Sequence, residues 1–205
     1  MKATTVTEEL IKEAAKNEFI NMGFAGARMQ KIAKNANINS ALLHYYFRSK
    51  ENLFEIVFAE TVNSIFETIN KALQDPNKDI LTKISDIVTN YLDFIAKYPK
   101  LPMFVLTELS CNPDRIKTLG NEIRTSRNFI FFAKQIENAK AQGIIKESVN
   151  PQDVFTDILS LTLFQFTVEP FLSIAFEFEE NNFSQFIDRR KKVITETIIN
   201  SIKNS

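Results

Sequence analysis

The sequence of 205 residues has no tryptophan, one cysteine and one histidine. Cys111 has no partner for a disulfide within the chain, and Cys111 and His44 together are too few for a structural zinc site. We therefore expect a reducing, cytoplasmic location. The N-terminal segment MKATTVTEEL lacks the apolar core of a signal peptide, so we expect no leader.

Net charge and long apolar runs are also lacking. The 25 basic residues equal the 25 acidic ones, which excludes a histone-like polycation. The most apolar stretch, residues 158–168, is too short to cross a bilayer, so we expect no membrane partner. We expect no enzyme and no cofactor either, because the sequence has no phosphate-binding loop and no clustered metal ligands.

Glycine and proline are scarce, and they separate segments whose apolar residues recur every three or four positions. This pattern predicts an all-α protein of about nine helices. The first predicted helix ends at Gly23, and the others cover 28–36, 40–47, 49–75, 79–98, 102–110, 113–142, 151–178 and 183–203. Pro170 lies inside an apolar pattern and must kink or end its helix.

Residues 28–47 have the parts of a helix-turn-helix unit, which is two short helices joined by a tight turn. The turn spans 37–39, where Asn37 suits a left-handed conformation at low cost. Asn39 or Ser40 can cap the helix that follows. A unit of this kind places its second helix in the major groove of DNA.

The segment GFAGARMQKIAKNANINSALLHYYFRSKENLF begins at Gly23 and resembles the DNA-binding domain of the TetR/AcrR family of bacterial transcriptional regulators. The elements that carry the resemblance are Gly23-Phe24, Ile32-Ala33, the turn 37–39 and the stretch Tyr46 to Leu53. It covers about residues 8 to 58. It implies a three-helix DNA-binding domain, residues 1–50, and a helical effector-binding and dimerisation domain, residues 51–205. The helix from Ser49 to Asp75 connects them.

The resemblance also implies which residues contact operator DNA. They are Arg28, Met29, Gln30, Asn39, Ser40, Ala41, Leu42, His44, Tyr45, Tyr46 and Lys50. Lys50, Arg28 and Tyr46 suit phosphate oxygens, whereas Gln30, Ser40, His44 and Tyr45 can reach base edges. Leu42 replaces a small residue of the family pattern. Because of this departure, the resemblance does not predict the operator sequence.

Structural alternatives stay open for several of these residues. His44 can face DNA, or it can cap or pack against its own helix. One of the two tyrosines, Tyr45 or Tyr46, can pack into the core. Lys50 can be an ordinary surface lysine in the first turn of its helix.

Charge is distributed unevenly along the chain. Residues 1–50 contain eight basic and four acidic residues, a formal charge of +4, so residues 51–205 carry −4. The positive part is the part that contains the helix-turn-helix pattern, as expected for a DNA-binding protein. We assign the basic block 189–192 to the solvated side of the last helix, with a nucleic-acid patch as the alternative.

Phenylalanine is concentrated toward the C-terminus, with 11 of the 19 residues between Phe129 and Phe186. Most of them should fill a core. Several are so close in sequence that they cannot all lie on the inward side of one helix, so some must face a cavity or another chain. We expect an apolar effector to contact Phe66, Phe104, Phe129, Phe132, Phe155 and Phe164, with plain core packing as the alternative for each. We expect a homodimer through residues 153–176 and 183–202, because the family resemblance implies a four-helix bundle.

The expected function is a ligand-responsive regulator, a repressor that binds a palindromic operator in double-stranded DNA and is released by a small apolar effector. The alternative is a helical small-molecule or lipid-binding protein without sequence-specific DNA binding. Selection from a random duplex library discriminates between the two functions, because only the regulator recovers a palindrome.

Overall fold

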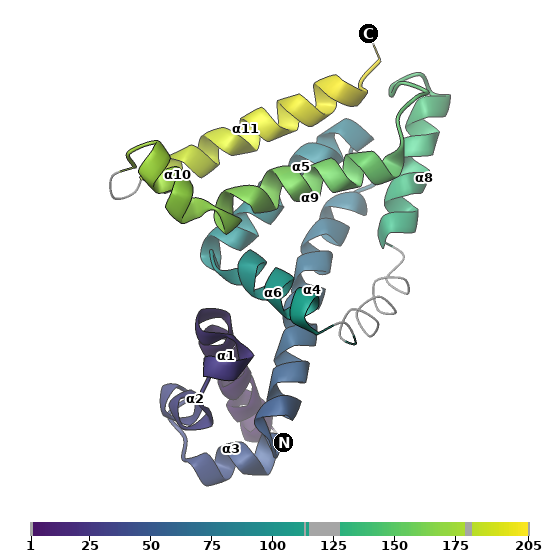
Figure 1. The fold of residues 1–205 in the computed structure, drawn as a ribbon. Coiled ribbons are helices and arrows are strands. Elements are labelled where there is room, and N and C mark those ends of the chain that lie inside the picture. Colours follow the sequence, from purple (N-terminus) through teal and green to yellow (C-terminus); the bar gives the residue numbers. More distant parts are fainter. Residues whose placement is uncertain (1, 113, 115–127, 179–181, 205) are drawn as a thin grey trace. The chain divides into compact units, whose positions relative to one another are not determined.

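The computed structural model describes residues 2–112, 114, 128–178 and 182–204, and these residues form ten helices. Figure 1 shows their arrangement within the chain. The side chains of residues 2–5 and 128 are outside the description. The chain forms two compact units, Met1–Ser64 and Ile65–Ser205, and the division falls inside one long helix. The predicted all-α fold is confirmed. The domain boundary predicted at residue 50 stays a prediction.

The first unit contains α1 (Lys2–Gly26), α2 (Met29–Asn35), α3 (Ser40–Phe47) and the N-terminal part of α4 (Lys50–Leu73). Its core is aromatic at the centre, where the rings of Phe19 and Phe54 meet edge to face with centroids 4.9 Å apart. Leu43 and Phe47 of α3 are buried in the same unit. These contacts anchor the inner side of α3 and leave its outer side to solvent.

Gly23 interrupts α1 without ending it. Its φ of 65° and ψ of 175° are not helical, and only glycine adopts this backbone region readily because it has no Cβ. The helix was predicted to end here. The regular helix does break at Gly23, as predicted, and one further turn follows it as far as Gly26.

The second unit contains the rest of α4 and six further helices. They are α5 (Ile80–Lys97), α6 (Leu101–Cys111), α8 (Asn128–Ala141), α9 (Pro151–Thr167), α10 (Glu169–Ala175) and α11 (Asn182–Ile202). Helix α5 packs against α8, α9 and α11 because apolar residues recur along one side of it, among them Ile84, Val88, Tyr91 and Ile95, all buried. Burial raises the pKa of the Tyr91 hydroxyl.

Pro170 divides what was predicted as one helix. It lies in the first turn of α10, and α9 and α10 meet at an angle of 69°. Of the two predicted outcomes, a sharp bend is the one observed. Among the described helices, none is by itself long and apolar enough to cross a membrane, although α9 and α10 together reach the required length and apolar content.

Two further predicted segments differ in part from the structure. Residues 128–141 of the helix predicted over 113–142 form α8, whereas residues 113 and 115–127 lie outside the described part. Cys111, the last residue of α6, is exposed. A backbone hydrogen bond holds the C-terminal end of α11: the N–H of Lys146 donates to the Ile202 carbonyl at 2.9 Å.

The basic block 189–192 does not form one solvated face. Arg189 and Lys192 are exposed, as predicted, but Arg190 and Lys191 are half-buried. Four consecutive residues point to four sides of a helix, so they cannot share a face. Hydrogen bonds to Asp188 and Asp93 raise the pKa of Lys191, which shows that this lysine serves packing within the second unit.

Candidate nucleic-acid interface

The turn between α2 and α3 has the predicted geometry. Asn37 has a φ of 55°, a left-handed value that asparagine tolerates. The N–H of Ile38 donates to the Ala33 carbonyl at 3.0 Å and closes the turn. The Asn39 side-chain oxygen accepts the Leu42 N–H at 2.8 Å, so Asn39 is the N-cap of α3. A capped first turn fixes the direction in which α3 leaves the turn.

The eleven residues predicted to contact DNA all belong to the first unit, and all have solvent access. The exposed ones are Arg28, Gln30, Asn39, Ser40, Ala41, Leu42, His44 and Tyr45, and the half-buried ones are Met29, Tyr46 and Lys50. Seven of the eleven lie on α3 or its N-cap, and the inner side of α3 is occupied by the buried Leu43 and Phe47. The structure thus leaves all eleven residues accessible to solvent, and their contact with DNA stays a prediction.

His44 combines the two predicted alternatives, because it is exposed and also caps its own helix. Its Nδ1 lies 3.0 Å from the Arg48 carbonyl oxygen. A carbonyl oxygen only accepts hydrogen bonds, so Nδ1 must carry the proton and donate. In the neutral ring, Nε2 is then an acceptor. The backbone of α3 therefore selects the tautomer that this histidine presents to a ligand.

The two neighbouring tyrosines have different environments. Tyr45 has 78% of its surface exposed, whereas Tyr46 is half-buried and its ring lies 6.3 Å from that of Phe47. The Tyr45 and Tyr46 rings meet edge to face at 5.5 Å. One tyrosine thus packs in part, as predicted, and it holds the other in a fixed outward orientation.

Lys50 is more than an ordinary surface lysine. Its ammonium donates to the Ala25 carbonyl at 3.3 Å and lies 4.8 Å from the centroid of the Phe24 ring. These contacts tie the start of α4 to the end of α1. Because an ammonium has three N–H donors, the group can hold Ala25 and still bind a phosphate oxygen.

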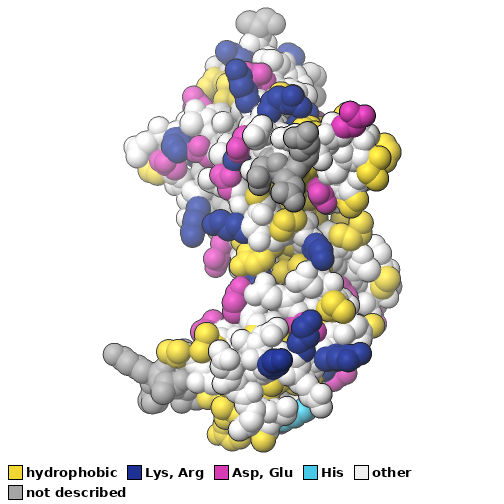
Figure 2. Space-filling model, turned by 90° about the vertical axis from the view of Figure 1, so that its left-hand side faces the viewer, with side chains coloured by type: hydrophobic (Ala, Val, Ile, Leu, Met, Phe, Trp, Pro, Cys, Tyr) yellow, Lys and Arg dark blue, Asp and Glu magenta, His cyan; other side chains and the backbone are white. Residues whose placement is uncertain are grey.

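Sequence reasoning missed further cations on this unit. Lys31, Lys34 and Arg48 are exposed, and Figure 2 shows Lys and Arg side chains on the same part of the surface as the only histidine. Lys31 also forms an ion pair with the buried Glu18 at 3.4 Å. The signal that could have found them is the spacing of Lys31 and Lys34, three residues apart on one side of α2.

The similarity to known proteins in sequence lies in the first unit. Residues 11–57 match the family profile of the bacterial regulatory proteins of the tetR family. Residues 11–57 are therefore a TetR-family DNA-binding domain. The chain is 35% identical over 51 residues to the HTH-type transcriptional regulator YhgD of Bacillus subtilis (strain 168), a match that covers 25% of this chain and 27% of YhgD. The predicted resemblance is thereby confirmed, and with it the helix-turn-helix DNA-binding domain that defines TetR-family regulators.

Solved structures extend the likeness to almost the whole fold. The ketosteroid transcriptional regulator KstR2 of Mycobacterium tuberculosis superposes with a TM-score of 0.68 at 14% identity, over 97% of this chain and 95% of that one. HlyIIR, a hemolysin II transcriptional regulator, gives 0.64 at 22% identity, over 98% and 99%. A TetR-like transcriptional regulator from Rhodococcus sp. RHA1 gives 0.61 at 19%, over 96% and 95%. These three regulators thus share the fold of the second unit as well as that of the first.

The six residues predicted to bind an effector all belong to the second unit, in different environments. The Phe155 ring of α9 lies 5.6 Å from that of Phe129 and 6.0 Å from that of Phe132 on α8. Phe132 and Phe104 are buried, Phe66, Phe129 and Phe155 are half-buried, and Phe164 is 57% exposed. The structure therefore joins three of them into one aromatic cluster between α8 and α9. Their contact with an effector stays a prediction.

A cleft in the first unit was not foreseen. It lies between α1 and α4, has a volume of about 590 Å³, and is lined by Val6, Leu10, Val57 and several charged residues. In the described part of the chain, no group of three or more His, Cys, Asp or Glu side chains is placed to hold a metal ion.

Proposed function

We propose that the protein is a TetR-family repressor of the cytoplasm that binds a palindromic operator as a homodimer and releases it when a small apolar effector binds. The observation that carries this proposal is the capped α3, whose inner side is buried while Ser40, Ala41, His44 and Tyr45 are exposed. A helix with this exposure can enter a major groove without rearrangement.

The DNA-binding part is supported by the separation of cations from base-reading groups. Arg28, Lys34 and Arg48 lie around α3, where they can neutralise phosphates, while the side chains of α3 itself face outward. Phosphate contacts set register and supply affinity that falls with salt, and base contacts supply specificity.

The test is selection of the full chain against a random duplex library, followed by a salt titration of the selected sequence. We expect an enriched palindrome whose half-site centres lie about one helical turn apart, with affinity that falls steeply with salt. Arg28→Ala should weaken binding to all sequences, whereas Lys97→Ala, at an exposed cation on α5, should have no effect. A library without enrichment would favour the alternative, a lipid-binding protein without sequence-specific DNA binding.

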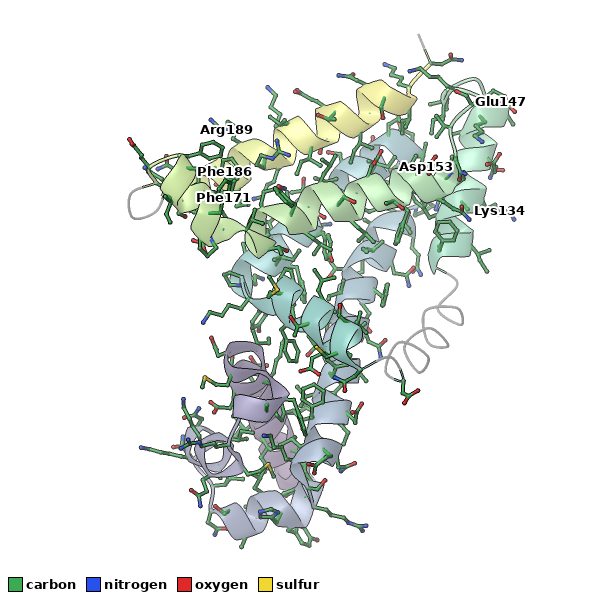
Figure 3. All side chains as sticks on the ribbon, viewed as in Figure 1. Lys134, Glu147, Asp153, Phe171, Phe186 and Arg189 are labelled. Carbon is green, nitrogen blue, oxygen red and sulfur yellow. The ribbon has the colours of Figure 1, made fainter. Side chains whose placement is uncertain are left out.

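The dimer is supported by the charges on α9 and α11. The two helices pack side by side in opposite directions (Figure 1). Asp153 and Asp157 are exposed in the first two turns of α9, whereas Arg189 is exposed in the first half of α11 and Lys192 at its middle. Asp153 and Arg189 consequently lie at opposite ends of the helix pair (Figure 3).

A two-fold axis perpendicular to this pair exchanges its ends. It places the basic end of α11 in one subunit against the acidic end of α9 in the other, and symmetry repeats the contact. Phe164, Phe171 and Val193 are exposed on the same helices and α10, and a partner would remove their apolar surface from water. The predicted dimer faces therefore have both complementary charge and apolar contact area.

The effector site is proposed at the aromatic cluster of Phe129, Phe132 and Phe155. Apolar compounds fit this composition, and the fold is shared with a protein described as a ketosteroid regulator. To act, an effector must bind the DNA-released state more tightly than the DNA-bound state. A thermal-shift screen with fatty acids and sterols, followed by operator release, tests this. Phe155→Ala should abolish the response, and Phe131→Ala, at an exposed phenylalanine on α8, should retain it.

A further inference from the structure

The outermost ridge of α3 is apolar. Leu43 and Phe47 point inward, and the opposite side of the helix carries Ala41, Leu42 and Tyr45. Leu42 is 36% exposed and Tyr45 78% exposed. The polar candidates Ser40 and His44 lie on the flank of this ridge rather than on its crest. Folding of the first unit does not account for an apolar crest that faces water.

The surroundings of this crest indicate what covers it. Exposed cations lie next to it on α2 and at the end of α3, among them Lys34 and Arg48. An apolar protein surface would leave these charges without partners, whereas a nucleic-acid duplex supplies phosphates for them. The chemistry that fits the crest is therefore an apolar group on a base edge between two phosphate strands. The C5-methyl group of thymine is the one apolar group that base pairs present in the major groove.

We propose that α3 reads thymine methyl groups through Ala41, Leu42 and Tyr45. This inference rests on the proposed DNA-binding function and adds the chemical class of the bases that are read. Ala41 and Tyr45 are four residues apart, so their Cβ atoms lie about 5–6 Å apart. Base pairs rise by about 3.4 Å, so the two ends of the ridge reach thymines one or two base pairs apart in each half-site.

The edge-to-face contact at 5.5 Å with Tyr46 holds the Tyr45 ring, and the Asn39 cap holds the backbone of Leu42. Both apolar contacts are therefore positioned before DNA binds. His44, on the flank of the ridge, acts differently. In the neutral ring its Nε2 can accept a hydrogen bond from an amino group of adenine or cytosine. Replacing thymine with uracil leaves those amino groups unchanged.

The experiment uses the full-length protein and the palindrome recovered by selection, with deoxyuridine replacing thymidine one position at a time. This exchange removes the methyl group and retains base pairing. We expect one or two positions per half-site at which the exchange weakens binding about 4-fold, and about 15-fold when both half-sites are changed, as burial of one and two methyl groups implies. Other thymines should show no effect.

A thermodynamic cycle assigns the effect to the ridge. In Tyr45→Ala or Leu42→Ala, the thymine and uracil operators should bind equally well at one of these positions, whereas Ser40→Ala should keep the full difference. Because all three side chains are exposed, these variants should fold like the parent, which a thermal melt checks. If the palindrome binds but no uracil exchange changes affinity by 2-fold, the methyl-reading proposal is wrong while DNA binding stands. If no palindrome is recovered, the proposed function itself fails.

Discussion

The dimer proposal makes a quantitative prediction for Arg189 and Asp153. The structure shows both residues exposed at opposite ends of the α9–α11 pair, and two-fold symmetry brings them together twice. An exposed ion pair contributes about 0.2–1 kcal/mol. Arg189→Asp replaces attraction with repulsion of similar size, which changes each contact by about 1 kcal/mol and the dimer by about 2 kcal/mol. We expect the dimer dissociation constant to rise about 30-fold.

Asp153→Arg should weaken the dimer to a similar extent, and the double variant should return to within about 3-fold of the parent, because the charges are exchanged rather than removed. Sedimentation equilibrium at low and high salt measures all four proteins. Arg189 also lies 5.5 Å from the centroid of the Phe186 ring, so Arg189→Ala separates the loss of this contact from the charge reversal. Lys71→Asp, an exposed site on α4, is the matched charge control.

The reasoning would be refuted by either of two results. One is a single reversal that changes the dissociation constant no more than Lys71→Asp does. The other is a double variant that is as weak as the sum of the two single variants, since this outcome would show that Arg189 and Asp153 do not meet across the two-fold axis.

Three further predictions concern single residues. Phe54→Ala should lower the free energy of unfolding by about 3–5 kcal/mol and abolish operator binding, because Phe54 is fully buried against the rings of Phe19, Phe24 and Phe58. Chemical denaturation measures this loss. As a control, Tyr45→Ala at an exposed site should lower the free energy of unfolding by less than about 0.5 kcal/mol. Asp79 caps α5 through the Thr82 N–H at 2.7 Å, and this bond lowers the pKa of its carboxyl group. Asp79→Ala should therefore cost about 1 kcal/mol at neutral pH. The difference from the parent should shrink as the pH falls from the ordinary aspartate pKa of 3.8 through the lower pKa of the folded state, where the carboxylate becomes protonated in the parent; a difference that stays constant throughout an acid titration would contradict this. His44→Asn should keep the melting temperature within a degree or two, since the amide can donate to the Arg48 carbonyl, yet change base preference in the selection assay; an unchanged selected sequence would show that the ring faces no base.

The local parts of the fold and interface were predictable because their causes are local. Asn37 and Asn39 specify the turn and the cap within a few residues, and Pro170 can only bend or end a helix. Gly23 breaks the first helix where the sequence predicted, whereas the short turn that follows it, up to Gly26, had no local signal.

The rest required tertiary structure. Which of two adjacent tyrosines is exposed depends on the packing of Tyr46 near Phe47, and the hydrogen bond from His44 to Arg48 depends on the positive φ of Arg48. The basic block 189–192 looked uniform in sequence, but only the packing of α11 against α5 shows that Lys191 pairs with Asp93. Composition likewise could not tell the buried Phe132 from the exposed Phe164.

The exposed thiol at the end of α6 has a practical consequence for spectroscopy. Cys111 is the sole cysteine of the sequence, so a nitroxide or fluorophore can be attached there without first removing other thiols. In a two-fold dimer this labelling yields one pair of identical probes and hence one interprobe distance. Following that distance while operator and then effector are added would report the population of each conformation directly, in the unmutated protein.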